Sequence, residues 1–290
     1  MRWQDLRRSD NVEDAGGGSG GGGFRIGGGL GVVGVLGLLV VGWLVGIDPL
    51  VMLQMLEGGG GGYVETAPDR PRSPADSGLR DFVSAILGST EDVWGDIFRR
   101  NGRTYERPHL VIYSGAVQSA CGFAQAAMGP FYCAPDRRMY IDLSFYDELR
   151  RRFHAPGDFA QAYVIAHEVG HHVQNLLGIM DRAHAAIQRA GSRAEANGYS
   201  VRLELQADCY AGLWAHHADE AKPLLEQGDV EQALNAASAI GDDRLQREAQ
   251  GRVVPDSFTH GTSAQRVRWF QQGLTQGTLQ ACDTFKAAKR

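Results

Sequence analysis

Apolar and polar positions divide the chain into a short N-terminal part, dominated by one apolar stretch, and a long C-terminal part with the periodicity of a folded domain. Between Ile26 and Ile47 there is no charged residue. These 22 residues would span about 33 Å as a helix, enough to cross the hydrocarbon core of a bilayer. A secretory signal peptide would have a shorter apolar core and a small-residue cleavage site. We therefore expect a retained transmembrane helix over residues 26–47.

The segments on either side of this stretch predict how it is oriented. Residues 1–25 end in a glycine run and predict a disordered tail, whereas the glycines and prolines of residues 48–78 predict an extended linker. The first basic residue after the stretch is Arg70, whereas four arginines precede it (Arg2, Arg7, Arg8 and Arg25). The positive-inside rule then places the tail in the cytoplasm and residues 79–290 outside, in a single-pass membrane protein.

Two pairs of glycines in the apolar stretch have the spacing of helix-packing motifs, Gly27 with Gly31 and Gly42 with Gly46. They permit oligomers through the membrane helix. Simple tolerance of glycine in membrane helices explains the same pattern. The lipid bilayer is thus one expected partner of the chain, and a second copy is an open alternative.

From residue 79 onward the periodicity predicts a mainly helical α+β domain. Two apolar runs predict buried strands, Leu110–Tyr113 and Met139–Leu143. Residues 79–99 predict a helix, a turn at Gly88-Ser89 and a second helix. A loop is expected over 251–262, and further helices are expected over 158–177, from about 200 to 216, over 219–250 and over 263–274.

Composition and charge argue against two other kinds of protein. With 29 basic and 34 acidic residues the net charge is −5, which gives no electrostatic footprint for nucleic acid. No two cysteines have C-x-x-C spacing, so a cysteine-based zinc ribbon is not indicated. The four cysteines fit either disulfides in an exported domain, with three possible connectivities, or buried thiols (Cys121, Cys133, Cys209 and Cys282).

The candidate chemistry lies on the helix expected over 158–177, which contains the sequence His-Glu-Val-Gly-His-His from His167 to His172. Histidines at i and i+4 share one face of a helix, so His167 and His171 can bind a single Zn²⁺. Glu168 is placed to take a proton from water on that ion. Gly170 weakens the helix, which indicates that another element packs closely there. His172 points about 100° away from His171 and is not expected to bind the same ion.

A catalytic zinc site needs a third protein ligand and an open fourth position. A third histidine of the metzincin type is excluded, because positions 174 and 177 are Gln and Leu. Glu204 is the best candidate, because it lies on a mostly apolar helix that can return alongside the first one. Asp208, four residues later, is placed to accept the second N–H of a ligand histidine. Solvated acids on an amphipathic helix are the alternative.

In the expected mechanism zinc polarises the scissile carbonyl and lowers the pKa of its water, and Glu168 passes the proton to the leaving amine. The oxyanion needs a further donor. His260, which precedes a helix, is the first candidate, with Arg266 and Tyr210 as others. A peptide or protein substrate would align on an exposed strand edge, for which 139–143 is the candidate.

Several longer stretches make the chain resemble a bacterial family of membrane-anchored neutral zinc metallopeptidases. These are Met1–Gln4, Gly129–Cys133, Tyr140–Phe145, His167–His172, Glu204–Cys209 and Phe258–Arg266. The resemblance covers essentially the whole chain and implies a zincin-like domain with a small edge sheet. It also implies one Zn²⁺ per chain held by His167, His171 and Glu204, with Glu168 as catalyst. The Glu204–Asp208 pattern is similar to that of membrane-associated gluzincins, in which an aspartate supports a ligand histidine.

Three functions remain in competition at this point. The leading hypothesis is a membrane-anchored zinc peptidase with its domain in the cell envelope. A non-catalytic zinc-binding scaffold is the second, although Glu168 has no purpose in a purely structural site. The third is a zinc hydrolase that acts on a non-peptide amide.

Overall fold

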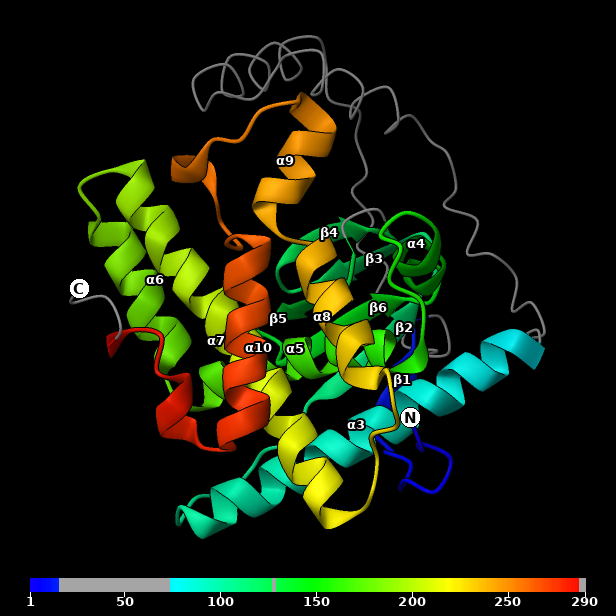
Figure 1. Ribbon diagram of the computed structural model, residues 1–290. Helices are drawn as coiled ribbons and strands as arrows, with labels where there is room; N and C mark the ends of the chain where they lie inside the picture. Colours follow the sequence, from blue (N-terminus) through cyan, green and yellow to red (C-terminus); the bar gives the residue numbers. More distant parts are fainter. Residues whose placement is uncertain (16–73, 127–128, 287–290) are drawn as a thin grey trace, which may run out of the picture. The chain divides into compact units, whose positions relative to one another are not determined.

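The computed structural model describes residues 1–15, 74–126 and 129–286. The expected transmembrane helix at 26–47, its glycine pairs and most of the expected linker lie outside the described residues. Among those that are described, no helix is both long and apolar enough to span a membrane. The described part is mainly helical with two small sheets, in agreement with the α+β expectation (Figure 1).

The larger sheet has four strands in the order β1-β2-β6-β5. Strands β1, β2 and β6 run parallel, and β5 is antiparallel to β6. Both predicted strands are confirmed as the two central ones, whose apolar runs are buried as expected for parallel strands. A separate antiparallel hairpin is formed by β3 and β4. The strands are β1 Val12–Asp14, β2 His109–Tyr113, β3 Ala116–Ser119, β4 Gly122–Gln125, β5 Phe131–Cys133 and β6 Arg138–Asp142.

Helix α3, Pro74–Arg100, is continuous, so the predicted turn at Gly88-Ser89 is wrong. Its start also shows that the expected linker ends before residue 74 rather than at 78. The glycine has a packing role instead, since a Cβ at Gly88 would lie 2.2 Å from the carbonyl oxygen of Arg7. The missing side chain admits another segment of backbone against the helix.

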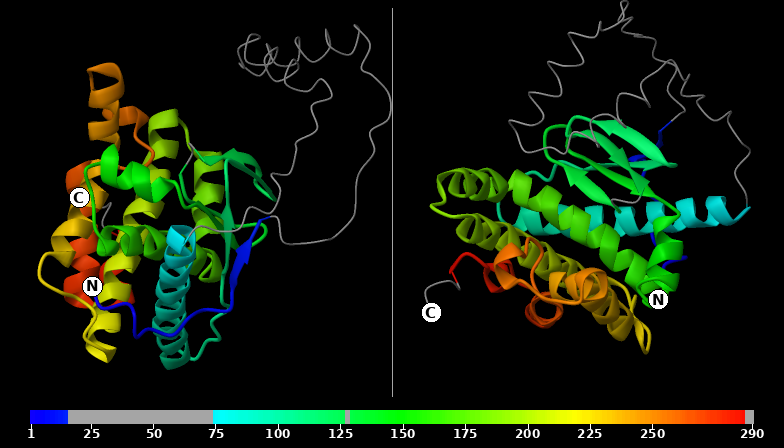
Figure 2. Two further views of the ribbon diagram at one scale, coloured as in Figure 1. Left: turned by 90° about the vertical axis from the view of Figure 1, so that its right-hand side faces the viewer. Right: turned by 90° about the horizontal axis from the view of Figure 1, so that it is seen from above.

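That segment is the chain's own beginning, residues 1–15, which we call the N-terminal arm. The predicted disordered tail over 1–25 is wrong for this part, because the arm packs against α3 and adds β1 to the sheet (Figure 2). Val12 is buried, and the ring of Trp3 meets Phe82 edge-on with centroids 5.3 Å apart. Three of its charged side chains pair with charged groups on α3: Arg7, Arg8 and Asp14.

The C-terminal helices follow the predicted pattern with shifted boundaries. The helix predicted over 158–177 is confirmed as α5, which ends just before Gly178 in a left-handed conformation (φ 65°). The second helix begins at Arg193, earlier than expected, and the stretch after 219 divides into separate helices. The helices are α4 Phe145–Arg151, α5 Asp158–Leu176, α6 Ile179–Arg189, α7 Arg193–Ala221, α8 Asp229–Ala239, α9 Asp242–Gln250 and α10 Ser263–Gln276, with short 3₁₀ turns η2 Pro255–Ser257 and η3 Leu279–Cys282.

Helices α3 and α5 separate the sheet from the other large helices. The sheet lies on one side of this pair, and α7, α8 and α10 lie on the opposite side (Figure 2). All four cysteines form disulfides rather than buried thiols: Cys121 bonds to Cys133 at the end of β5, and Cys209 on α7 bonds to Cys282. Helix α5 therefore lies between the sheet and a layer of helices, and both contribute residues to the candidate site.

Candidate metal centre

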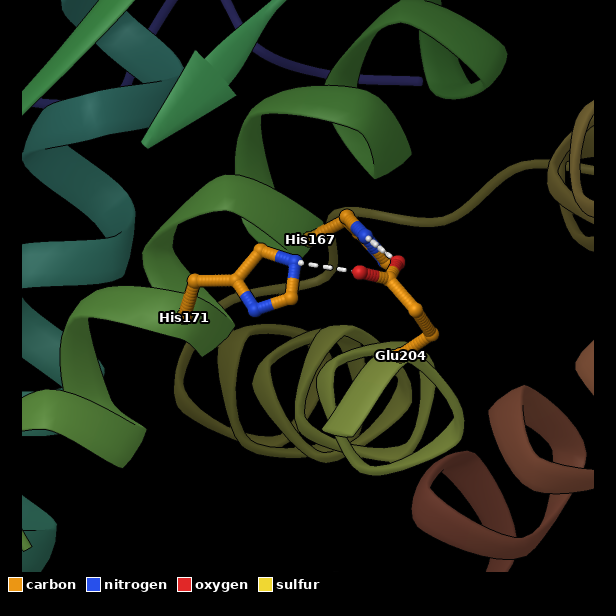
Figure 3. Close-up of side chains that lie close together, drawn as sticks. All are labelled: His167, His171 and Glu204. Carbon is orange, nitrogen blue, oxygen red and sulfur yellow. Dashed lines mark hydrogen bonds and ion pairs between the residues drawn. The ribbon is translucent and has the colours of Figure 1, made fainter. Parts of the chain in front are cut away.

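Helix α5 carries both histidines of the motif on its face toward α7. The close approach that Gly170 predicted is present: a Cβ there would lie 3.0 Å from the Cα and carbonyl oxygen of Ala207 on α7. Ala207 lies between Glu204 and Asp208 in the sequence, so this contact sets the distance between the two groups of polar side chains. Figure 3 shows His167 and His171 reaching from α5 toward the carboxylate of Glu204 on α7.

Three side chains converge at this point. The Nε2 atom of His167 lies 3.2 Å from one carboxylate oxygen of Glu204, and the Nε2 atom of His171 lies 3.5 Å from the other. One ligand atom from each of the three residues falls within 4.8 Å of the others. All three side chains are largely removed from solvent, with exposed fractions of 9%, 13% and 19% in the order His167, His171, Glu204.

The opposite nitrogen of each histidine is fixed by an oxygen. His167 Nδ1 lies 2.9 Å from Asp208 Oδ1, and His171 Nδ1 lies 2.9 Å from the side-chain oxygen of Gln174. Carboxylate and amide oxygens accept hydrogen bonds, so each Nδ1 carries the proton and each Nε2 presents a lone pair. In the neutral rings, two imidazole lone pairs would thus face a carboxylate, an arrangement that either protons or a metal ion would stabilise.

The pKa values of His167, His171 and Glu204 indicate that positive charge is favoured at this point. Burial alone would lower the pKa of His167, but hydrogen bonds with Asp208 and Glu204 raise it to about 10. Glu204 likewise raises the pKa of His171 against the effect of burial. The two histidines in turn hold the pKa of the buried Glu204 well below its usual range. A divalent cation at this point would supply the charge that protons otherwise provide.

Asp208 belongs to a fully buried network. Its carboxylate accepts hydrogen bonds from Nε and a terminal nitrogen of Arg266, both at 2.9 Å, and from the hydroxyl of Tyr163. Arg266, which the sequence offered as a candidate oxyanion donor, is 2% exposed, and its guanidinium forms a salt bridge with Asp208. Its position makes it a support for the carboxylate that orients His167. Sequence reasoning missed Tyr163, which looked like an ordinary core residue.

His172 is directed away from the three converging side chains, as the sequence predicted. Its Nε2 donates to the carbonyl oxygen of Glu106 at 2.7 Å, and its Nδ1 accepts from the hydroxyl of Tyr132 at 3.1 Å. Burial lowers its pKa to about 4, so the ring is neutral. His172 therefore ties α5 to the sheet side of the domain.

His260 enters the site from the loop before α10. It lines the same cleft as Glu168 and the converging ligands. Its Nδ1 lies 3.2 Å from Asp242 Oδ1, while Asp242 Oδ2 accepts the backbone N–H groups of residues 259 to 261 at 2.6–3.1 Å. This hydrogen bond to Asp242 raises the pKa of His260. Tyr210, by contrast, is buried against Trp94 and does not line the cleft.

The cleft has a volume of about 820 Å³ and runs between the sheet, α5, α6 and α7. Residues 129–132, 134 and 135, which include most of β5, line one wall. The predicted edge strand, 139–143, is wrong, because β6 pairs with strands on both sides and β5 forms the edge. Sequence alone did not single out β5, because it is only three residues long.

The donor set is chemically suited to zinc. Two imidazole nitrogens and one carboxylate oxygen are the three-ligand set typical of catalytic zinc, which leaves a coordination position for water or substrate. The orienting Asp208 and Gln174 are the outer partners such ligands usually have. Glu168, half-buried, lines the cleft beside them. The residues present thus fit a zinc ion, and Glu168 lies in the same cleft.

Comparison with known proteins identifies the family of this chain. A family model described as "Putative neutral zinc metallopeptidase" matches residues 1–285. "Uncharacterized protein YpfJ" of Escherichia coli (strain K12) is 50% identical over 290 residues, which cover 98% of this chain and 99% of the relative. "Uncharacterized protein Rv2575" of Mycobacterium tuberculosis is 40% identical over 255 residues, covering 84% and 85% respectively. No solved structure gives a significant match. The chain belongs to the neutral zinc metallopeptidase family.

Proposed function

We propose that this protein is a membrane-anchored, zinc-dependent peptidase. The observation that carries the proposal is the convergence of His167 Nε2, His171 Nε2 and the Glu204 carboxylate, which could hold a metal ion, in the cleft that Glu168 also lines. When bound, zinc would polarise a carbonyl and activate a water for attack. The family assignment supports the same class of chemistry.

Other side chains of the cleft carry out the proton transfer and stabilise the oxyanion. Glu168 takes a proton from the attacking water and returns it to the leaving amine, a contribution of roughly 10²–10⁴-fold in rate. His260 donates a hydrogen bond from Nε2 to the oxygen that becomes negative. Asp242 holds the His260 ring by Nδ1 and favours its protonated form, which is the form that stabilises an oxyanion best.

The substrate in this proposal is an extended peptide. Strand β5 offers the free edge of the sheet along the cleft, so a peptide can add as a further strand with its backbone hydrogen-bonded to β5. The disulfide between Cys121 and Cys133 fixes the end of that edge. Such an edge holds peptide backbone rather than a small amide, which favours a peptidase over a hydrolase of other amides.

We further propose that the catalytic domain lies outside the cytoplasm, held at the bacterial inner membrane by the apolar segment 26–47. Its two disulfides support an oxidising compartment, because cytosolic thiols are kept reduced.

The test compares the full-length chain with its Glu168→Gln variant in detergent. The full chain is needed because the N-terminal arm is part of the folded domain. We expect one equivalent of zinc in both proteins and hydrolysis of a mixed peptide library only by the wild type. A Glu168→Gln variant that cleaves at the wild-type rate would remove Glu168 from the mechanism.

Two further variants separate the roles of the other groups. Glu204→Gln should weaken zinc binding, and unchanged zinc affinity would reassign the third ligand. His260→Gln should keep zinc and lose roughly 10²–10³-fold in turnover, the usual cost of losing an oxyanion donor. A wild-type protein that binds zinc and cleaves no peptide would favour the scaffold or the amide hydrolase instead.

A further inference from the structure

The N-terminal arm packs against α3 and pairs with β2, and a buried carboxylate on α3 anchors it there. The side chain of Glu91 on α3 is 0% exposed. The hydrogen bonds described for it come from the arm: Arg7 at 2.7 Å, Ser9 Oγ at 2.6 Å and Asn11 Nδ2 at 2.7 Å. An ionised carboxylate is costly to bury without partners. Glu91 is therefore a specific buried binding partner for the N-terminal arm.

Backbone contacts make the fit specific. Ser9 N donates to the carbonyl oxygen of Ser84 at 3.0 Å, and Ser84 Oγ donates to the carbonyl oxygen of Ser9 at 3.0 Å. Gly88, one turn along α3, has no side chain at the point where the Arg7 carbonyl approaches. Beyond these contacts, β1 pairs in register with β2 from Val12 to Asp14.

The arginines of the arm have partners in the domain. Arg7 bonds to Asp92 at 2.9 and 3.0 Å, and Arg8 bonds to Asp81 at 2.6 and 2.8 Å. Arg7 and Arg8 are two of the four basic residues on which the expected cytoplasmic orientation of the N-terminus depended. Their presence is explained by docking onto α3, without any reference to the membrane.

We propose that the N-terminal arm and the catalytic domain lie on the same side of the membrane. Strand pairing and a buried Glu91 both require direct contact, which a bilayer between arm and domain would prevent. This revises the single-pass arrangement with a cytoplasmic N-terminus, and it does not depend on peptidase activity.

Single cysteines test this arrangement in the full chain. All four native cysteines are in disulfides, so the unmodified protein is the unlabelled control. Asp10 on the arm and Gln271 on α10 are exposed. Intact cells with a permeabilised outer membrane are treated with a membrane-impermeant maleimide, and Asp10→Cys and Gln271→Cys are compared before and after lysis.

We expect both cysteines to react to the same extent before lysis. If both are protected until lysis, the same-side proposal stands, and the proposed location of the domain outside the cytoplasm fails. If Gln271→Cys reacts in intact cells while Asp10→Cys is protected until lysis, the arm lies across the membrane from the domain and the proposal is overturned.

Docking of the arm has its own matched pair of variants. Gly88 and Gly95 both lie on α3, but a Cβ at Gly95 would meet no atom within 4 Å. In the solubilised full chain, we expect trypsin to cut after Arg7 and Arg8 at least tenfold faster in Gly88→Val than in Gly95→Val or wild type. Equal cleavage rates in all three proteins would show that the arm is not docked.

Discussion

The substitution Asp208→Asn should reveal how strongly the site depends on one buried carboxylate. Asp208 is completely buried and accepts hydrogen bonds from His167, Tyr163 and two nitrogens of Arg266. An asparagine keeps the shape but removes the charge, and its NH₂ group must face a donor of Arg266 or His167. The substitution therefore perturbs both the folded domain and the orientation of a ligand.

Its magnitude follows from the burial of Arg266, which is 2% exposed. Breaking a buried pair by removing one partner costs about 3–5 kcal/mol, because the remaining charge is left unpaired. For a domain of this size that corresponds to a fall in Tm on the order of 10 °C. Loss of the carboxylate behind a ligand histidine weakens metal affinity by roughly 10–100-fold.

The assay measures Tm by circular dichroism and zinc affinity by chelator competition on the full-length protein in detergent. The double variant Asp208→Asn with Arg266→Met distinguishes the two effects, because it removes the unpaired charge as well. We expect it to recover most of the lost stability and none of the lost affinity. Glu231→Gln, an exposed change on α8, is the control. A single Asp208→Asn variant with zinc affinity within twofold of wild type would refute the reasoning.

Three further outcomes are expected. Gly170→Ala should force α7 away from α5 and weaken zinc binding on the order of tenfold. The control Gly95→Ala should stabilise the fold by up to ~1 kcal/mol with unchanged zinc affinity. Equal zinc affinities in the two variants would contradict the packing argument. Burial lowers the pKa of His172 to about 4 in the folded protein, below its value of about 6.5 in the unfolded chain. The free energy of unfolding should therefore fall as the pH drops from 6.5 toward 4, by about 2 kcal/mol at pH 5. Urea unfolding of chelator-treated wild type and His172→Asn should show the weaker acid dependence in the variant, and parallel pH profiles would exclude His172 as its source. Replacing Cys209 and Cys282 by serine should cost about 4 kcal/mol of unfolding free energy in urea, because their loop spans 73 residues; a loss below 1 kcal/mol would show that the loop is already ordered without the bond.

The parts of the site that could be predicted are those governed by local periodicity. His167 and His171 share a face because a helix places i and i+4 together, whatever surrounds it. The two central strands were predictable for a similar reason, since buried parallel strands have continuous apolar runs. Gly170 was informative because a glycine inside a good helix is unfavourable, and the structure shows Ala207 packed against it.

The supporting residues could not be predicted because their roles depend on long-range packing. Gln174 appeared in the sequence only as a departure from the metzincin pattern, and it holds the Nδ1 atom of His171. Asp242 begins α9 in the sequence, with nothing in its spacing to connect it with His260, 18 residues later. Both partnerships become visible only when separate elements are brought together, and no periodicity within one element encodes them.

The arginines of the N-terminal arm show how one sequence feature can have two physical explanations. A cluster of positive charge before an apolar stretch predicts a cytoplasmic flank, because translocating cations across the membrane is unfavourable. The same charge can be present because carboxylates elsewhere in the fold need partners, and Arg7 and Arg8 have such partners in Asp92 and Asp81. The positive-inside rule counts charges without regard to where they end up after folding. When a flanking segment is itself a strand of the domain, the pairing of that strand constrains topology more strongly than its charge. For this chain, the pairing of β1 with β2 is therefore the stronger argument that the N-terminal arm and the candidate metal centre lie on the same side of any membrane.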